Sequence, residues 1–310
     1  MRLTVGELEQ TTPFSAVIDE FISLKEAQGK SKRTMKDLRQ DLQKFYNFSS
    51  KTLNCEILKK ELVNYFSLIP STSAAVYNRP YGVLNSFFNY CVRQEIIPYN
   101  PLTRAEIKKK KDDSEIHAAA MDDIRKLLDC CDRRTYTGFR NHTIISLMID
   151  TGIRTSELVR LEDGDFDEKG RRIIIRPEVC KTKHSRILYL SPSTTSAIGK
   201  LIRLKPKGFS DKIFPSREGN EMDTNNLSRE FRNLSEKAGV KITPYQLRHS
   251  FATYAAANGM SVFLLQQLMG HSDISMTRRY TDINQEQLEE AHSNFSPLEL
   301  VERGKYLGRV

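Results

Sequence analysis

The chain has 310 residues, enough for two domains that each have a core, and it contains no apolar run long enough to cross a membrane. Lysine and arginine number 48 against 39 aspartate and glutamate, and the formal net charge of +9 is compatible with a polyanionic partner. Five cysteines without CxxC spacing, and a start without the apolar segment of a secretory signal, favour a cytoplasmic protein with reduced thiols, no metal and no cofactor.

Residues 13–105, which follow a polar lead over 1–12, carry four helical patterns and predict a helical domain. The second helix is capped by Ser31 and the third by Asn54, since both side chains can accept from free N–H groups of a first turn. In the third helix Ile57 belongs to the stripe that should face inward.

The fourth helical pattern contains Pro80, which should kink or start the helix, because proline lacks an N–H and clashes with the preceding turn. NPL at 100–102 followed by EIKKKKDDSE indicates a linker, which we assign to residues 106–117.

Two basic clusters lie in this half of the chain. The first cluster lies on the second helix, opposite its apolar stripe, and consists of Lys32, Arg33, Lys36 and Arg39. The second lies in the linker and consists of Lys108, Lys109, Lys110 and Lys111. Both fit a solvated surface and both fit contact with DNA phosphates.

Residues 118–284 predict a second, mostly helical domain with a small sheet, and 285–310 form a C-terminal tail that could pack on its own domain or on a neighbouring protomer. The predicted elements are a helix from Met121, helices over 139–151 and 225–239, and two β-rich runs, 171–176 and 186–190, which flank VCKTKHS as a hairpin.

The stretch 243–280, TPYQLRHSFATYAAANGMSVFLLQQLMGHSDISMTRRY, has strong helix punctuation. Thr243 caps a helix that ends at Gly259, and Ser261 caps a second helix that stops at Gly270. His271 is therefore expected in a turn beside a helix C-terminus. Tyr280 follows nine residues later, on a further short helix.

This stretch, together with TGIRTSELVRL around Arg154, resembles the signature of the tyrosine recombinases, the phage-integrase and Xer family. SKRTMKDLRQDLQKF resembles the start of the family's core-binding domain more loosely. The resemblance implies a mainly α fold with a small antiparallel β-sheet. A helical core-binding domain would precede a catalytic domain.

Six positions match the family's catalytic pattern, five of them outside the predicted hairpin. Arg154 and Arg248 match the two catalytic arginines, whose planar forks suit the non-bridging phosphate oxygens. Glu157 matches the acidic residue that orients the first arginine. By the same resemblance His271 would hydrogen-bond the scissile phosphate, and Tyr280 would be the nucleophile that forms a 3′-phosphotyrosyl link.

The hairpin lysine of the family, a general acid for the 5′ oxygen, matches Lys181, with Arg186 five residues on as in the family's KxxxxR pattern. Lys183 is the rival for this role. We assign Lys183 and Arg186 to DNA binding.

One position departs from the family pattern, because Tyr245 stands where HxxR has its histidine. A phenol can donate a hydrogen bond to phosphate but is a poor base near neutral pH. His249 is the other candidate, although it lies about 100° from Arg248 around the helix. The identity of the general base stays open.

The implied function is cutting and rejoining duplex DNA at paired inverted sites through a Holliday junction, by a monomer or weak dimer that assembles as a homotetramer on DNA, with accessory directionality factors. With only the lead of 1–12 before the first helix, we expect the simple two-domain type, an Xer-like or mobile-element enzyme. A non-catalytic DNA-binding regulator and a type IB topoisomerase-like enzyme are the alternatives.

Overall fold

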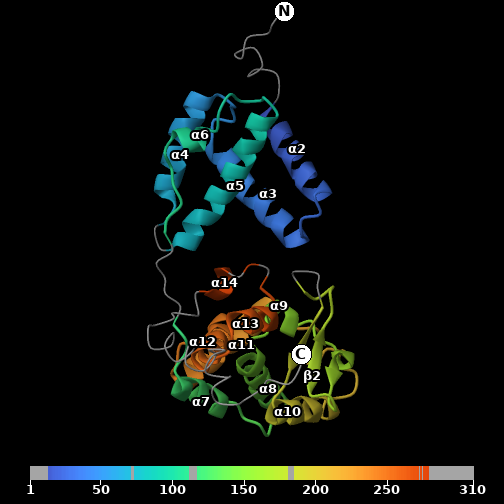
Figure 1. Cartoon of the computed structure of the whole chain (residues 1–310). Helices are drawn as coiled ribbons and strands as arrows, with labels where there is room; N and C mark the ends of the chain where they lie inside the picture. The colour runs from blue at the N-terminus through green and yellow to red at the C-terminus, as the bar shows by residue number, and fades with distance from the viewer. Residues whose placement is uncertain are drawn as a thin grey trace, which may run out of the picture. The chain divides into compact units, whose positions relative to one another are not determined.

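The computed structural model describes residues 13–70, 73–111, 117–180, 185–271, 273 and 275–278. The chain divides into two compact units, Met1–Ser114 and Glu115–Val310, and each has a hydrophobic core of its own. Figure 1 labels their elements.

The N-terminal unit is built from helices packed around an aromatic core. Its described elements are α2 (Phe14–Ala27), α3 (Lys32–Phe48), α4 (Cys55–Leu68), α5 (Ala74–Arg93) and α6 (Pro101–Arg104). Phe21 packs edge-on against Phe87 and Phe45 against Phe88, with ring centroids 5.5 and 6.0 Å apart. Burial of these rings supplies much of the hydrophobic free energy that holds α2, α3 and α5 together.

The predicted caps of this unit are confirmed. The Ser31 hydroxyl accepts from the N–H of Thr34, and the Asn54 side chain accepts from the N–H groups of Glu56 and Ile57. The inward position predicted for Ile57 is wrong, because 43% of the residue is exposed, while Leu58 beside it is fully buried.

Helix α5 continues through Pro80 and does not start there. It begins at Ala74, six residues earlier, where the Ser73 hydroxyl accepts from the N–H of Val76. Proline removes only the hydrogen bond to the carbonyl of Val76, which lies on an exposed turn where water can bind it. Asn100 caps α6 and Leu102 is fully buried, so NPL, which the sequence suggests as the approach to the linker, packs within the N-terminal unit.

The C-terminal unit is mostly helical and contains one small antiparallel sheet, which confirms the predicted fold class. Its described elements are α7 (Met121–Asp129), α8 (Tyr136–Thr151), α9 (Thr155–Leu158), η1 (Asp163–Asp165), β1 (Phe166–Asp167), β2 (Arg172–Ile175), β3 (Arg186–Tyr189), α10 (Pro192–Arg203), α11 (Thr224–Ala238), α12 (Pro244–Ala257), α13 (Val262–Met269) and α14 (Ser275–Arg278).

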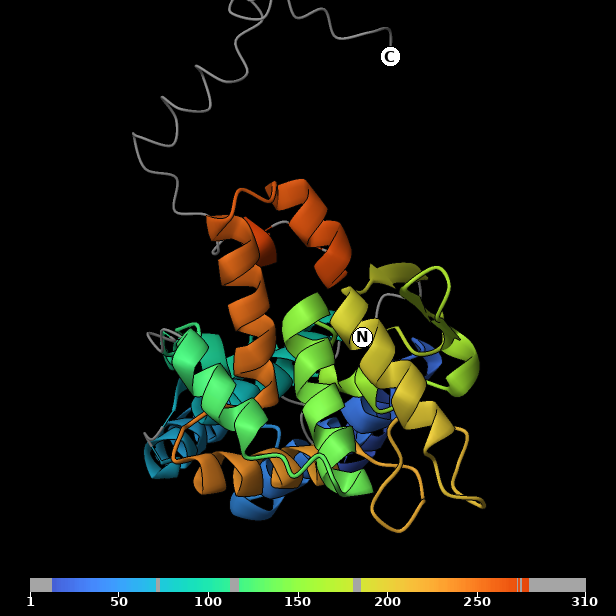
Figure 2. The same ribbon diagram turned by 90° about the horizontal axis from the view of Figure 1, so that it is seen from below.

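Helix α8 is the centre of this unit, and in Figure 2 it stands in light green between the orange α12 and the yellow α10. Ile145, Leu147 and Met148 of α8 are fully buried. The sheet has the order β1-β2-β3, and Ile175 pairs with Arg186 where the β2–β3 hairpin leaves the sheet. The tip of that hairpin, 181–184, is outside the described residues.

Helix α10 has no counterpart in the sequence analysis, which predicts no element between the second β-rich run and residue 225. Its first turn contains Thr194 and Thr195, which are polar in sequence but buried in the fold, so they hide the apolar stripe. Among the described residues, no helix is both long and apolar enough to cross a membrane.

Candidate active site and DNA-binding residues

The first site arginine, Arg154, is positioned by the turn that ends α8. Gly152 adopts the left-handed conformation there, with φ of 62°, and Arg154 then caps the short helix α9. Its Nη1 donates to the Glu157 carboxylate at 3.1 Å, and its Nη2 donates to the carbonyl of Gly270. The guanidinium is therefore fixed at both ends, with 18% of the side chain exposed.

Glu157 is fully buried and holds two arginines, not one. Arg186, the first residue of β3, donates to Oε1 from Nη1 at 2.9 Å and to Oε2 from Nη2 at 2.6 Å. Burial alone would raise the pKa of the Glu157 carboxyl, but the hydrogen bonds and charges of Arg186 and Arg154 outweigh it and hold this pKa below its usual value. Glu157 is thus a carboxylate that neutralises part of a cationic cluster.

The C-terminal end of α13 collects three guanidinium groups. The carbonyl of Leu268 accepts from Arg186 Nε at 3.1 Å, that of Met269 from Arg248 Nη2 at 2.8 Å, and that of Gly270 from Arg154. The last carbonyls of a helix have no partners within it and carry its partial negative charge. The helix end therefore acts as a common support for the three arginines.

Arg248 comes from α12, with only 7% of the residue exposed. Besides the Met269 carbonyl, it binds the carbonyl of Gly152 through Nη1. Its Nη2 lies 2.9 Å from Nε2 of His271, and Nδ1 of His271 lies 2.8 Å from the hydroxyl of Thr277. His271 is 8% exposed and Thr277 is fully buried, so this chain of polar groups is enclosed.

Both glycines whose carbonyls bind these arginines have positive φ, and a Cβ at either position would crowd neighbouring side chains. A Cβ on Gly152 would collide with the ring of Phe251 and lie 2.9 Å from Sδ of Met269. A Cβ on Gly270, where φ is 63°, would lie 3.0 Å from Nη1 of Arg154. A Cβ at Gly152 would therefore force its neighbours to move, and one at Gly270 would require the guanidinium groups of Arg154 and Arg186 to shift by a few tenths of an ångström.

The structure brings together four residues predicted for catalysis or orientation: Arg154, Glu157, Arg248 and His271. Arg186, assigned in the sequence analysis to DNA binding, lies within this cluster with only 11% of its side chain exposed.

The remaining residues predicted for catalysis are not part of this group. Lys181, Lys183 and Tyr280 are outside the described residues. Tyr245 lies on the first turn of α12, with 46% of the residue exposed. Sequence reasoning missed Thr277, because a threonine six residues after a histidine carries no motif.

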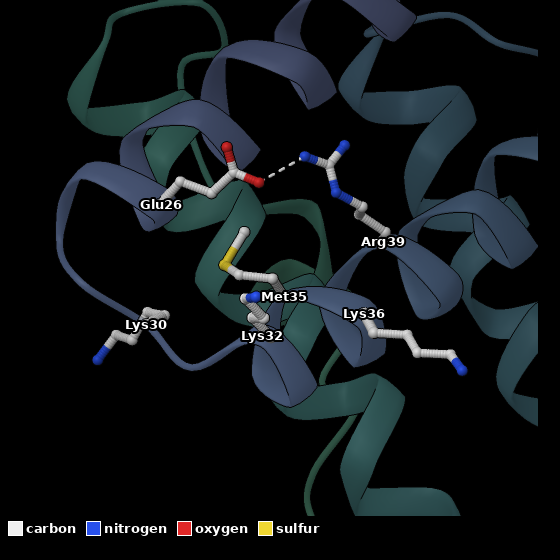
Figure 3. A pocket seen from close by; sticks show the side chains of 6 residues that line it. All are labelled: Glu26, Lys30, Lys32, Met35, Lys36 and Arg39. Carbon is white, nitrogen blue, oxygen red and sulfur yellow. Dashed lines mark hydrogen bonds and ion pairs between the residues drawn. The ribbon is translucent and has the colours of Figure 1, made fainter. Parts of the chain in front are cut away.

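The basic residues of α3 are all exposed, and three of them line an open depression at the start of the helix. Figure 3 shows the lining side chains, which are Glu26, Lys30, Lys32, Met35, Lys36 and Arg39. Arg39 is paired with Glu26 at 2.7 Å, while Lys36 extends away from that pair. Four cations and one carboxylate make this depression a positive surface.

The lysine run is partly packed on α5. The side chain of Asn78 accepts from the backbone N–H of Lys110 at 2.9 Å and donates to its carbonyl at 2.8 Å. The ammonium of Lys110 lies 4.3 Å from the centre of the Tyr77 ring, a cation–π distance. Residues 106–111 of the predicted linker therefore pack, at Lys110, on the N-terminal unit.

None of the five cysteines, all of which lie in the described part of the chain, takes part in a disulfide, and their side chains are buried or half-buried. Within the described part of the chain, no group of three or more His, Cys, Asp or Glu side chains could hold a metal ion.

Comparisons with known proteins identify the family of the chain. Residues 119–287 match the model of the phage integrase family. The chain is 27% identical over 296 residues to the tyrosine recombinase XerD of Listeria innocua, covering 91% of this chain and 98% of the relative.

Among solved structures, the Tn1549 transposon integrase in complex with circular intermediate DNA is similar with a TM-score of 0.75 and 18% identity, over 92% of this chain and all of that one. A lambda integrase tetramer bound to a Holliday junction is similar with a TM-score of 0.70 and 15% identity, over 88% and 78% of the two chains. The family match spans more than half of the sequence, so the chain belongs to the phage integrase family of tyrosine recombinases.

Proposed function

We propose that this chain, a tyrosine-type site-specific DNA recombinase, cuts and rejoins duplex DNA through a 3′-phosphotyrosyl intermediate, with Arg154 and Arg248 as the groups that bind the scissile phosphate. The buried arginine cluster at the end of α13 carries the proposal. Guanidinium groups fixed before the reaction stabilise the negative charge that develops on phosphorus oxygens, and such stabilisation is commonly the largest catalytic effect.

The nucleophile and the acid are assigned by position in the motifs. Tyr280 is the proposed nucleophile and Lys181 the proposed acid for the 5′ oxygen, with Lys183 as the rival acid. Covalent attachment through a tyrosine preserves the energy of the broken phosphodiester, so the strand can be rejoined without a cofactor.

Tyr245 occupies the histidine position of the second-arginine motif. Its exposure on the first turn of α12 supports a role as a hydrogen-bond donor to phosphate. Glu157 and Arg186 are proposed to hold Arg154 in place and not to contact DNA, since their charged groups bind each other in the interior.

DNA binding is assigned to basic residues of the N-terminal unit and to Lys183 of the C-terminal unit. The exposed Lys32, Arg33, Lys36 and Arg39 of α3 and the lysines 108–111 are proposed to contact phosphates. The proposed domain bounds are 13–105 and 118–284, joined by a linker over 106–117.

The active assembly is proposed to be a homotetramer on two inverted sites, by analogy with the lambda integrase tetramer solved on a Holliday junction. Accessory factors that choose the direction of recombination are part of the same proposal.

The test is covalent trapping on a nicked suicide substrate made from sites that the purified protein selects from random DNA. Wild type, Tyr280→Phe and the matched control Tyr245→Phe are compared on a denaturing gel, each with and without EDTA. A covalent band that resists EDTA, persists in Tyr245→Phe and is lost in Tyr280→Phe is the expected result. Specific binding with no covalent band in wild type would reject the enzyme and favour a DNA-binding regulator.

A further inference from the structure

The segment that leads into the C-terminal unit, residues 117–119, is bound to one face of α12, and we call it the entry segment. The Ser250 hydroxyl accepts from the backbone N–H of Ala119 at 2.8 Å, and the Tyr254 hydroxyl donates to the carbonyl of Ala119 at 2.9 Å. Ala119 is 5% exposed and Ser250 is fully buried. Because water has little access to these groups, the loss of either bond would leave a backbone group of Ala119 without a partner that water could replace.

The side chains that bind the entry segment share one face of α12. Gln246, Ser250 and Tyr254 follow one another at intervals of four residues, and the side-chain amide of Gln246 donates to the carbonyl of His117 at 3.2 Å. Arg248 lies about 160° around the helix from Gln246 and Ser250. On that opposite side its guanidinium binds two carbonyls of the arginine cluster. Helix α12 is therefore held by the entry segment on one side and by the arginine cluster on the other.

The linker is also bound at its other end. The backbone of Lys110 is held by the Asn78 side chain of α5 through both its N–H and its carbonyl, at 2.9 and 2.8 Å. Only residues 111–116 lie between this anchor and the entry segment in the sequence. A short stretch of chain thus connects a helix of the N-terminal unit with the helix that carries Arg248.

We propose that docking of the entry segment on α12 fixes the position of Arg248, with Ser250 and Tyr254 as positioning residues for this arginine. This rests on the proposed function, in which Arg248 binds the scissile phosphate. A helix moves as a rigid element, so a displacement of α12 carries the guanidinium with it. A misplacement of about 1 Å in a catalytic group can lower a rate about 100-fold.

The first test observes the Arg248 side chain in the free, full-length protein through the NMR signals of the arginine Nε–H groups, with the Arg248 signal identified by its loss in Arg248→Lys. We expect Ser250→Ala and Tyr254→Phe to shift this signal, because each removes one bond between α12 and the entry segment. Ser228→Ala is the matched control and should leave the signal in place, since Ser228 of α11 makes the same local bond, to the carbonyl of Thr224 at 2.7 Å. An Arg248 signal that is unchanged in both α12 variants would overturn the proposal.

The second test measures single-turnover formation of the covalent complex together with DNA affinity, on the suicide substrate. Ser250→Ala and Tyr254→Phe should each slow the reaction about 10- to 100-fold. DNA affinity should stay close to that of wild type, because many phosphate contacts contribute to it. Ile198→Val, which shortens a fully buried side chain of α10, controls for lost stability and should keep the wild-type rate at a temperature where all variants are folded.

The double variant Ser250→Ala/Tyr254→Phe should be about as slow as the slower single variant, since both hydroxyls act through Ala119. Wild-type rates in both single variants would overturn the proposal. So would an Ile198→Val variant that is equally slow, because general loss of stability would then be the cause. If wild type forms no covalent complex at all, the proposed function fails, while the NMR test still decides whether the entry segment positions Arg248.

Discussion

Replacing Glu157 by glutamine should destabilise the C-terminal unit strongly, because the buried carboxylate is shared by Arg154 and Arg186. Oε1 accepts from both guanidinium groups and Oε2 from Arg186 at 2.6 Å and from the backbone N–H of Arg154. Glutamine removes the charge and turns an NH2 group toward donors. Breaking a buried ion pair on one side costs about 3–5 kcal/mol.

For a unit of this size, where 1 kcal/mol shifts the melting temperature by about 2–4 °C, this loss corresponds to about 6–20 °C. The assay is thermal and urea unfolding of the full-length protein, wild type against Glu157→Gln. Glu168→Gln is the matched control, since Glu168 forms an exposed ion pair with Arg203 at 3.0 Å and such pairs contribute at most about 1 kcal/mol.

The pH dependence of the unfolding free energy is a second measurement of the same interaction. The folded-state pKa of Glu157 lies below its value in the unfolded chain, so the stabilisation is fully present above the unfolded pKa and is lost as the pH falls through the folded one. The difference in free energy of unfolding between wild type and Glu157→Gln should therefore be constant at neutral pH and should become smaller below a pH of about 4.3. A gap below about 1 kcal/mol at pH 7, or one that widens in acid, would refute the reasoning.

Two further predictions use matched pairs of variants. Gly152→Ala should destabilise the protein clearly more than Gly239→Ala in urea unfolding, because both positions have positive φ but only a Cβ at Gly152 meets Phe251, whereas nothing lies within 4 Å at Gly239. Similar losses would contradict the steric account. Arg186→Gln should slow cleavage without changing the salt dependence of DNA binding, whereas Lys36→Gln should reduce the slope of log affinity against log salt by about 1. A reduced slope for Arg186→Gln would show that this arginine does meet phosphate.

The sequence predicts the elements around the site best where side-chain caps and glycines set the ends. Helix α13 begins after Ser261 and ends before Gly270 as predicted, because a hydroxyl cap and a left-handed glycine act locally. Helix α10 is missed and α5 runs through its proline, because in both cases packing against other helices outweighs the local preference.

The predicted site is recovered for the residues that belong to motifs, and incomplete where the backbone takes part. The positions of Arg154 and Arg248 follow from the motifs. The backbone carbonyls of Leu268 and Met269 also bind arginines, but every residue has such a carbonyl, so the residue types do not reveal this role. From the sequence alone Arg186 is assigned to DNA binding, and only the pairing of β2 with β3 shows that it lies beside Glu157.

The arginine cluster at the end of α13 sets stability and phosphate affinity against each other. Three guanidinium groups face one carboxylate and a helix end that carries roughly half a negative charge, which leaves an excess of roughly one and a half positive charges. That surplus is what an incoming phosphodiester neutralises. A second acidic side chain near the cluster would raise the free energy of unfolding, and the same charge would lower the affinity for DNA. Added negative charge can therefore stabilise this site only at the expense of function.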